Sequence, residues 1–246
     1  MRRDSPYYIP SIGALQSASL FRGVDEEMME EILSHFVPMT LPKKSVIASW
    51  QTVESFFVII GGRVKVSRID PETGREYTVF LLSRGDAFDV ISLLEGKEHD
   101  VMIEAIDELQ LLKTSMKTAR DWLDRHPEFN KNFLPYLGRK MHALEDAAAD
   151  LALLDTTTRL ARLILHHVDA KSDGPAEGYA VRLIDDLSHE TLAQMIGSVR
   201  KVVNLDIQKL KKENIIEASR GNLLVKDLQA LAKKAKTVLP TVSKDE

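Results

Sequence analysis

The chain has 246 residues, a length that suits one large domain or two small ones. Its composition, 44% hydrophobic and 28% charged, is typical of a globular protein. It contains no cysteine, which excludes structural disulfides, thiolate zinc sites and cysteine-ligated iron–sulfur clusters. No apolar run approaches the roughly 18 residues of a membrane span. The N-terminus also lacks the apolar segment of a signal peptide. We therefore expect a cytoplasmic protein without membrane contact.

The net charge of -4 is unevenly distributed along the chain. Residues 200–246 carry eleven Lys and Arg against six Asp and Glu, so this end is basic while the rest is acidic. The asymmetry indicates an anionic partner for the C-terminal end, and the alternative is a solvated lysine face.

Residues 1–17 contain two prolines and scattered polar groups, and we expect them to form an arm. Residues 25–36 repeat apolar side chains at helical spacing. Two β-rich runs then flank Gly61-Gly62, where positive φ angles would permit a tight hairpin, and the second run, VKVSRI, alternates as a half-buried strand does. Further short strands separated by turns predict a β-sandwich or barrel over residues 18–126.

A long helix is predicted over residues 127–154, after the His126-Pro127 boundary. Its apolar residues follow steps of three and four over two and a half heptads, which is typical of a parallel helix pair and predicts a homodimer. An amphipathic helix packed on its own domain is the alternative. The predicted seam consists of Leu134, Leu137, Met141, Leu144, Ala148 and Leu151, and Pro135 falls near its start.

Two short helices joined at Gly197 are predicted in the segment that follows, within a C-terminal domain of residues 155–246. Ser188 is placed to cap the first helix, HETLAQMI, and Gly197 supplies a tight turn. The second helix would start at Ser198 or Val199 and bury Val199, Val203, Ile207 and Leu210. This arrangement matches helix-turn-helix geometry.

The outward face of the second helix carries side chains suited to base edges in double-stranded DNA. Arg and Lys donate to guanine, Asn and Gln pair with adenine, and leucine can contact a thymine methyl. Residues 214–231 then predict strand, turn, strand and helix, which is the wing of a winged helix. The predicted DNA contacts are Ser188, Ser198, Arg200, Lys201, Asn204, Leu205, Gln208 and, at the wing tip, Arg220, for which a solvated turn arginine is the alternative.

Together these segments resemble the cyclic-AMP receptor / fumarate–nitrate regulator (CRP/FNR) superfamily of bacterial transcription factors. The resemblance covers roughly residues 18–236 and is carried by SLFRGV, by FFVIIGGRVKVSRIDPETGREYTVFLLSRGDAF, by LALLDTTTRLARLIL and by LSHETLAQMIGSVRKVVNLDIQKLKKENII. It implies an α+β chain with a β-roll sensor, a dimerisation helix and a winged helix-turn-helix. It also implies a homodimer that binds a near-palindromic operator and RNA polymerase, as an activator or a repressor.

The sequence departs from the cyclic-AMP binders of that superfamily. Val90 stands where they carry a glutamate for the ribose, and His99-Asp100 stands in place of the Arg-Ser pair for the cyclic phosphate. Cyclic AMP is therefore not the expected effector, because Asp100 would repel a phosphate. On the second helix, Lys201 replaces a glutamate that accepts from cytosine, which lysine cannot do, so the half-site should differ.

The stretch GDAFDVISLLEGKEHDV resembles the haem-associated nitrosative-stress regulators of the superfamily. That resemblance implies haem, and the candidate ligands are His99, Met141 and His142. A small organic acid, or no ligand at all, stays open. The expected effector pocket comprises Phe88, Val90, Ile91, His99, Asp100, Met141 and Leu144.

The mechanism we expect is a population shift in which the effector changes packing at the seam and, through a hinge near residues 155–157, the separation of the two DNA-binding helices. One alternative is a cyclic-nucleotide-type regulatory module of an enzyme without DNA binding. Another is a β-barrel enzyme that uses the cluster Asp89, Glu95, Glu98, His99 and Asp100, although we find no nucleophile or phosphate loop beside it.

Overall fold

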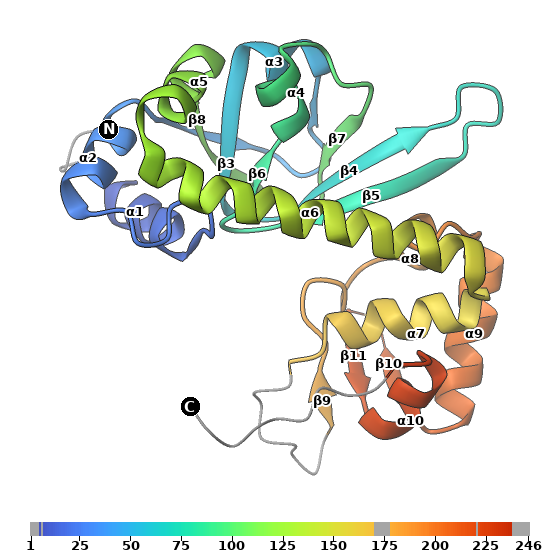
Figure 1. Cartoon of the computed structure of the whole chain (residues 1–246). Coiled ribbons are helices and arrows are strands. Elements are labelled where there is room, and N and C mark those ends of the chain that lie inside the picture. The colour runs from blue at the N-terminus through green and yellow to red at the C-terminus, as the bar shows by residue number, and fades with distance from the viewer. Residues whose placement is uncertain (1–4, 6, 170–177, 220, 238–246) are drawn as a thin grey trace. The chain divides into compact units, whose positions relative to one another are not determined.

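The computed structural model describes residue 5 and residues 7–169, 178–219 and 221–237. The chain divides into two compact units, residues 1–144 and residues 145–246. Helix α6 (Pro127–Leu153) begins in the first unit and ends in the second (Figure 1). No helix in the described part of the chain combines the length and apolar character required to cross a bilayer.

The first unit is built on two four-stranded sheets whose strand pairs are all antiparallel. One sheet has the order β1-β8-β3-β6 and the other β2-β7-β4-β5. The strands are β1 (Val37–Leu41), β2 (Val46–Ile47), β3 (Ser55–Gly61), β4 (Val64–Ile69), β5 (Glu76–Leu82), β6 (Ala87–Phe88), β7 (Met102–Ala105) and β8 (Leu109–Ser115). The expectation of a two-sheet β domain is confirmed.

Two hydrophobic clusters hold this unit together. One lies between the sheets and includes Phe57 and Phe88, whose rings stack with centroids 5.1 Å apart. The other joins Phe56 and Val58 of β3 to the helices on the outer face of the same sheet. Strand β3 is therefore buried on both faces, which explains its unbroken apolar run. The helices are α1 (Tyr8–Ser17), α2 (Glu26–Ser34), α3 (Ser49–Glu54), α4 (Val90–Glu95) and α5 (Met116–Arg125).

The predicted hairpin at Gly61-Gly62 is wrong. Strand β3 pairs with β6 and β8, whereas β4 pairs with β5 and β7, so the two glycines join strands of different sheets. The positive φ was expected and is present at Gly62, at 82°. Local sequence specifies that the chain turns there, but the partner of each strand depends on the rest of the domain.

Two further expectations for this unit differ from the structure. Strand β4 does not alternate, because its first four residues are all buried. Residues 8–17 form helix α1 instead of an extended arm, and Ala14 and Leu15 of this helix are fully buried in the outer cluster. On β4, Lys65 is buried because its ammonium pairs with Glu76 and Glu104 of the neighbouring strands, whereas α1 is buried because it packs on the outer cluster.

The second unit contains the end of α6, four shorter helices and a small sheet of order β10-β11-β9 among its described residues. Its core is formed by apolar side chains of α7, α8 and α9, of which Leu160, Ala193, Val203 and Leu210 are fully buried. The elements are α7 (Thr156–His166), β9 (Tyr179–Ala180), α8 (His189–Met195), α9 (Arg200–Lys212), β10 (Ile216–Ser219), β11 (Asn222–Val225) and α10 (Leu228–Lys234).

We predict that Gly62→Ala destabilises the protein by more than about 2 kcal/mol, because alanine is strained at positive φ and its Cβ would lie 2.4 Å from the Glu108 carbonyl oxygen. Gly74→Ala is the matched control, since Gly74 also has positive φ but no atom lies within 4 Å of the added Cβ. It should cost about 1 kcal/mol. Equal urea midpoints for the two variants would contradict the close approach at Gly62.

Candidate nucleic-acid interface and sensor site

Helices α8 and α9 are joined by a compact turn. The Ser188 hydroxyl oxygen accepts a hydrogen bond from the Thr191 N–H at 3.1 Å, so the predicted N-cap of α8 is confirmed. Gly197 has a φ of 61°, and the Ser198 N–H donates to the Ala193 carbonyl oxygen at 2.8 Å. Ala193 is fully buried, which lets the second helix cross close to the first.

Helix α9 has one buried face and one exposed face. Val203, Ile207 and Leu210 are at most 3% exposed and hold the helix on the unit's core. The opposite face presents a contiguous set of exposed polar and apolar side chains, with Leu205 at 61% exposure. These are Arg200, Lys201, Asn204, Leu205 and Gln208, as the spacing predicts.

Two residues at this helix depart from the predicted pattern. Val199 was expected in the buried stripe but is 52% exposed, because it has extended backbone angles as the N-cap and precedes the first helical turn. Asp206 was missed as an inward residue. It is buried, and its carboxylate accepts a 2.6 Å hydrogen bond from the Thr157 hydroxyl, which ties α9 to the first turn of α7. Its spacing, three residues after Val203 and four before Leu210, was the available signal.

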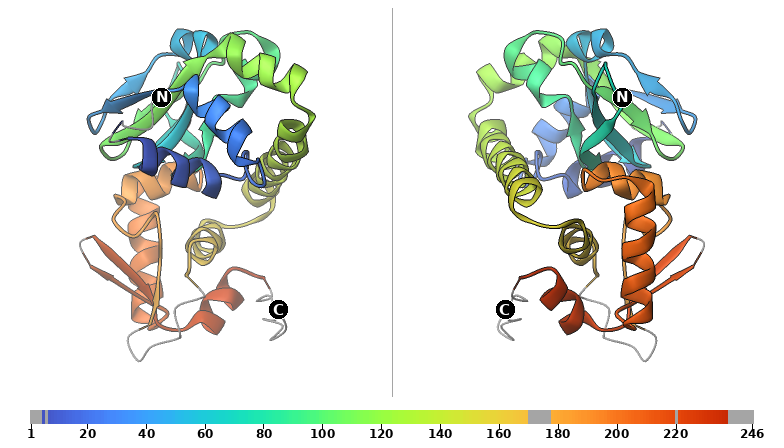
Figure 2. Two further views of the ribbon diagram at one scale, coloured as in Figure 1. Left: turned by 90° about the vertical axis from the view of Figure 1, so that its left-hand side faces the viewer. Right: turned by 90° about the vertical axis from the view of Figure 1, so that its right-hand side faces the viewer.

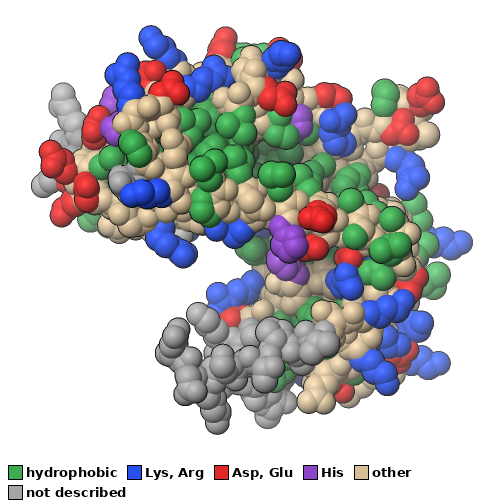
Figure 3. Space-filling model, viewed as in Figure 1, with side chains coloured by type: hydrophobic (Ala, Val, Ile, Leu, Met, Phe, Trp, Pro, Cys, Tyr) green, Lys and Arg blue, Asp and Glu red, His purple; other side chains and the backbone are tan. Residues whose placement is uncertain are grey.

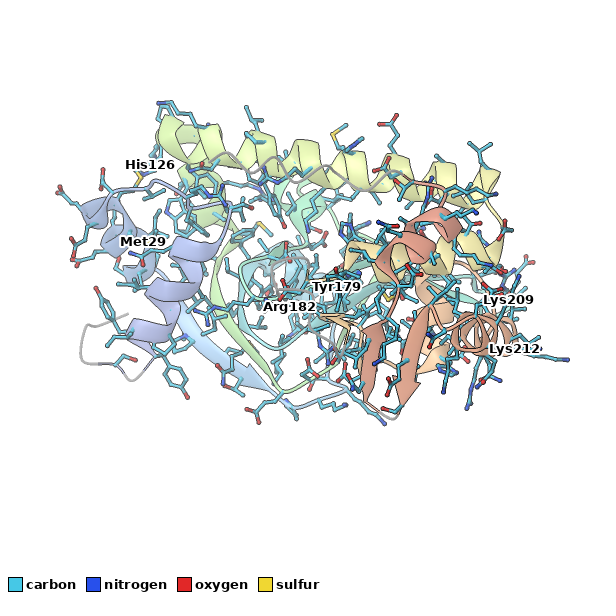
Figure 4. All side chains as sticks on the ribbon, turned by 90° about the horizontal axis from the view of Figure 1, so that it is seen from below. Met29, His126, Tyr179, Arg182, Lys209 and Lys212 are labelled. Carbon is cyan, nitrogen blue, oxygen red and sulfur yellow. The ribbon has the colours of Figure 1, made fainter. Side chains whose placement is uncertain are left out.

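Strands β10 and β11 form the predicted wing, a hairpin beside α9 (Figure 2). The Lys211 ammonium donates to the Ala218 carbonyl oxygen of β10 at 2.8 Å, so it braces the wing. Lys209 and Lys212, marked in Figure 4, are exposed and form no ion pair with another described residue. Arg220, the predicted wing-tip contact, lies outside the described residues.

The junction between α6 and α7 is braced by charged side chains within the second unit. Asp155 caps α7, and hydrogen bonds from the Thr158 N–H and hydroxyl hold the pKa of the Asp155 carboxyl below its usual value. Arg162 of α7 donates to Asp150 of α6 at 2.5 Å and to the Ala235 carbonyl oxygen at 2.8 Å. The Arg162–Asp150 ion pair thus bridges the two helices at the predicted hinge.

The heptad positions of α6 form an exposed apolar stripe. Leu134 and Met141 are 64% and 69% exposed, and Leu144 and Leu151 about 40%, with Ala148 also exposed. Leu137 is partly buried against the outer core cluster. Pro135 is accommodated within the continuous helix. Exposed apolar stripes of this kind mark interaction surfaces.

Helix α6 is also fastened to the turn that precedes β6. The Lys140 ammonium lies 2.9 Å from an Asp86 carboxylate oxygen and 5.4 Å from the centroid of the Phe80 ring. The Tyr136 hydroxyl donates to the Ala87 carbonyl oxygen at 3.1 Å. Burial, together with the nearby Asp86 charge, raises the pKa of Tyr136, so its hydroxyl stays protonated and remains a donor.

Immediately after β6, Asp89 is the centre of a buried hydrogen-bond cluster, of which the sequence grouped Asp89 with His99 but gave no sign of Thr52. Its carboxylate accepts from the Thr52 hydroxyl at 2.9 Å and from the Ser92 hydroxyl at 2.6 Å, and lies 2.9 Å from His99 Nδ1. Asp89 is the N-cap of α4 and only 7% exposed. Because Thr52 and His99 are distant in sequence, only folding brings them to Asp89.

The residues expected to line one effector pocket lie in different surroundings. Phe88 is buried between the sheets, while Val90 packs on the outer cluster and Ile91 is 41% exposed. Asp100 is at the surface, paired with Arg68 at 3.3 Å. An anion approaching the start of α4 would therefore meet Asp89 and not Asp100. Of the expected set, His99 is the residue that joins the buried cluster.

Comparison with known proteins divides the chain in the same way as the geometry. Residues 39–126 match the family model of the cyclic nucleotide-binding domain, and residues 158–234 match that of the Crp-like helix-turn-helix domain. The first match covers the two sheets and α5, and the second runs from α7 to α10. A β-rich sensor-type domain followed by a helix-turn-helix defines a transcription regulator.

Curated relatives align over nearly their whole length. The chain is 26% identical over 223 residues to the CRP-like cAMP-activated global transcriptional regulator of Mycobacterium tuberculosis, covering 90% of this chain and 98% of that protein. It is 27% identical over 217 residues to the global nitrogen regulator of a Synechocystis strain, covering 87% and 93%.

The fold is also shared with a solved structure. A CooA mutant from Carboxydothermus hydrogenoformans superposes with a TM-score of 0.70 and 25% identity, covering 83% of this chain and 90% of that one. The two family models, the relatives and the fold agree: the chain belongs to the CRP/FNR superfamily and is a transcription regulator with a DNA-binding helix-turn-helix.

Proposed function

We propose that the protein binds DNA as a homodimer whose two α9 helices enter successive major grooves. The observation that carries this proposal is the sidedness of α9, which buries its apolar stripe and exposes Arg200, Lys201 and Asn204 near its N-terminal end. In helix-turn-helix proteins that end reaches the base edges. The alternative function, a regulatory module without DNA binding, does not account for the match of residues 158–234 to a helix-turn-helix family model.

Specific roles follow from the position of each side chain on α9. Arg200 and Lys201 donate to guanine acceptors, Asn204 and Gln208 suit adenine, and Leu205 suits a thymine methyl. Ser188 and Ser198, at the N-terminal ends of the two helices, contact phosphates, as do Lys209 and Lys212. Because lysine has no acceptor, Lys201 cannot contact the amino group of cytosine, which sets the half-site apart from that of glutamate-bearing relatives.

The exposed stripe on α6 supports pairing of two copies. Burying Leu134, Met141 and Leu144 against the same residues of a second chain removes a large apolar surface from water. Pairing of this kind sets the distance between the two α9 helices, which must be about 34–36 Å for successive grooves. RNA polymerase, recruited or blocked by the bound dimer, is the further partner.

Control by a signal at the sensor has a physical route within the first unit. The turn at Asp86 and Ala87 contacts Lys140 and Tyr136 of α6 on one side and leads into the Asp89 cluster on the other. A ligand that rearranges this cluster would shift α6 and so change the population of the DNA-binding geometry. A cyclic phosphate does not suit the site, because the buried Asp89 carboxylate already occupies the start of α4.

The Asp89 cluster allows one candidate cofactor, haem, to be compared with the residues that would bind it. His99 bonds Asp89 through Nδ1, which leaves Nε2 for iron, and a carboxylate on the other ring nitrogen is the usual partner of a metal-ligating histidine. Met141 and His142 of α6 are the other candidate ligands. When bound, haem would supply an iron that takes a diatomic gas. In this chain Asp89 would orient the His99 ring.

We predict that Lys201→Ala changes the preferred sequence more than the overall affinity, because it removes a base-edge donor. Lys212→Ala is the control. It should weaken binding to all sequences alike and lower the salt slope by about one, as expected for a lost phosphate contact. Titrations of a panel of duplexes at several salt concentrations distinguish the two. A uniform loss for Lys201→Ala would make it a phosphate contact.

We predict that Leu144→Asp gives folded monomers, because two buried carboxylates would face each other across the seam. Arg139→Asp places a carboxylate on the opposite side of α6 and should leave the dimer intact. Sedimentation velocity gives the mass, and circular dichroism checks the fold. A dimer of Leu144→Asp as stable as that of the unmodified chain would remove α6 from the interface.

We predict a Soret band when the protein is titrated with haem, shifted by nitric oxide, and lost or displaced in His99→Ala. Asp89→Asn keeps the side-chain volume and should shift the band without abolishing haem binding, because the partner of His99 changes. Visible spectra over the titration test this. Absence of a Soret band with the unmodified protein would exclude haem. The sensor would then bind a small organic acid or no ligand at all.

A further inference from the structure

An exposed apolar patch lies on helices α3 and α4 of the first unit, whose residues are not part of the heptad stripe of α6. Trp50 of α3 is 55% exposed, and Ile91 and Leu94 of α4 are 41% and 52% exposed. Helices α3 and α4 are in contact with each other, so these three side chains belong to adjacent surfaces. Hydrophobic side chains gather on this face, over α3, α4 and α6 (Figure 3).

Hydrogen bonds to α3 and α4 hold the patch in a fixed conformation. The Thr52 hydroxyl of α3 donates to Asp89, the cap of α4, and the Ser49 hydroxyl donates to Glu98 at 3.1 Å. The Arg120 guanidinium donates to the Ser92 and Leu93 carbonyl oxygens at 2.9 and 3.0 Å, which fixes the other end of α4. A preorganised apolar surface loses little entropy on association. Tryptophan is one of the residue types enriched among the side chains that dominate interface binding energy.

The patch is continuous with the stripe on α6. Tyr136 contacts the Ala87 carbonyl oxygen, and α4 begins three residues later at Val90. Val90 of α4 and Leu137 of the stripe pack against the same core cluster. Figure 3 shows hydrophobic side chains over α4 and over α6 on the same face, so a chain seated on the stripe would extend over the exposed side of α4.

We propose that the patch of Trp50, Ile91 and Leu94 docks a second copy of this chain and enlarges the dimer interface beyond α6. The inference rests on the dimer of the proposed function. A seam of two and a half heptads is shorter than the three to four that mark a self-sufficient coiled coil, and stable interfaces bury about 1,200–2,000 Å². The patch supplies the missing apolar area. It also places the Asp89 cluster directly behind the interface, so that a change at the sensor alters dimer packing.

Tryptophan fluorescence provides a direct test, because the chain has two tryptophans and Trp122 is only 4% exposed. Acrylamide quenching of the full chain reports on Trp50, and Trp50→Phe identifies its component. In the dimer we expect the quenching constant of Trp50 to fall about threefold or more relative to the Leu144→Asp monomer, as for a side chain at an interface core.

Sedimentation of Leu94→Ser provides the second measurement. In a two-fold symmetric dimer the substitution is present on both sides of the interface. The dissociation constant of the dimer should therefore rise about tenfold or more. Val37→Ser is the control, because Val37 is 64% exposed on β1, outside the patch. It should leave the constant unchanged.

The outcomes separate the patch from the dimer itself. A dimer in which Trp50 is quenched as readily as in the monomer overturns this proposal and leaves the α6 seam in place, with the patch free for another ligand. A chain that stays monomeric at every concentration overturns both. Protection of Trp50 in the dimer together with the loss in Leu94→Ser supports the proposal.

Discussion

The burial of one face of α9 is the constraint on which the DNA-binding end depends. Val203, Ile207 and Leu210 must leave water, and the core of α7 and α8 is where they can do so. Once they are buried, the helix cannot rotate, and Arg200, Lys201 and Asn204 have to face outward. Thr157 adds a second restraint by holding Asp206. The packing of α9 therefore determines which side chains face DNA, and no separate interaction is needed to orient them.

The sensor end depends on a buried carboxylate in a comparable way. A charged group in an apolar domain is costly unless donors surround it, and Asp89 has Thr52, Ser92 and His99 around it. The same three bonds join α3, α4 and the segment before β7 into one piece. Since the turn before Asp89 is fastened to α6 through Lys140 and Tyr136, we propose that a disturbance of this cluster is transmitted to α6. In the proposed mechanism, sensing and structural integrity use the same bonds.

The sequence predicts features that arise from short-range periodicity and capping. The heptad steps of α6, the cap at Ser188 and, except at Val199 and Asp206, the faces of α9 agree with the structure, because each depends on neighbours within a few turns. The pairing of β3 and β4 with different sheets could not be predicted, since a strand does not encode its partner locally. Helix α1 was missed because its burial depends on a cluster formed by distant residues.

The sites show the same division. Base-contacting candidates lie on one helix, so their spacing was sufficient to group them. The Asp89 cluster collects side chains from three segments, and only the fold reveals it. The sequence offered two partial clues: Asp89 and His99 fall in one cluster of polar residues, and an acidic residue directly before an apolar helix is typical of an N-cap.

The central claim is that two copies present paired α9 helices to one face of a duplex. Its most direct test is selection of binding sites from a random double-stranded library by the full chain at low salt, with and without haem. The account predicts enrichment of two inverted half-sites whose centres are about 10 base pairs apart. Enrichment of a solitary half-site, or of no sequence at all, would contradict it.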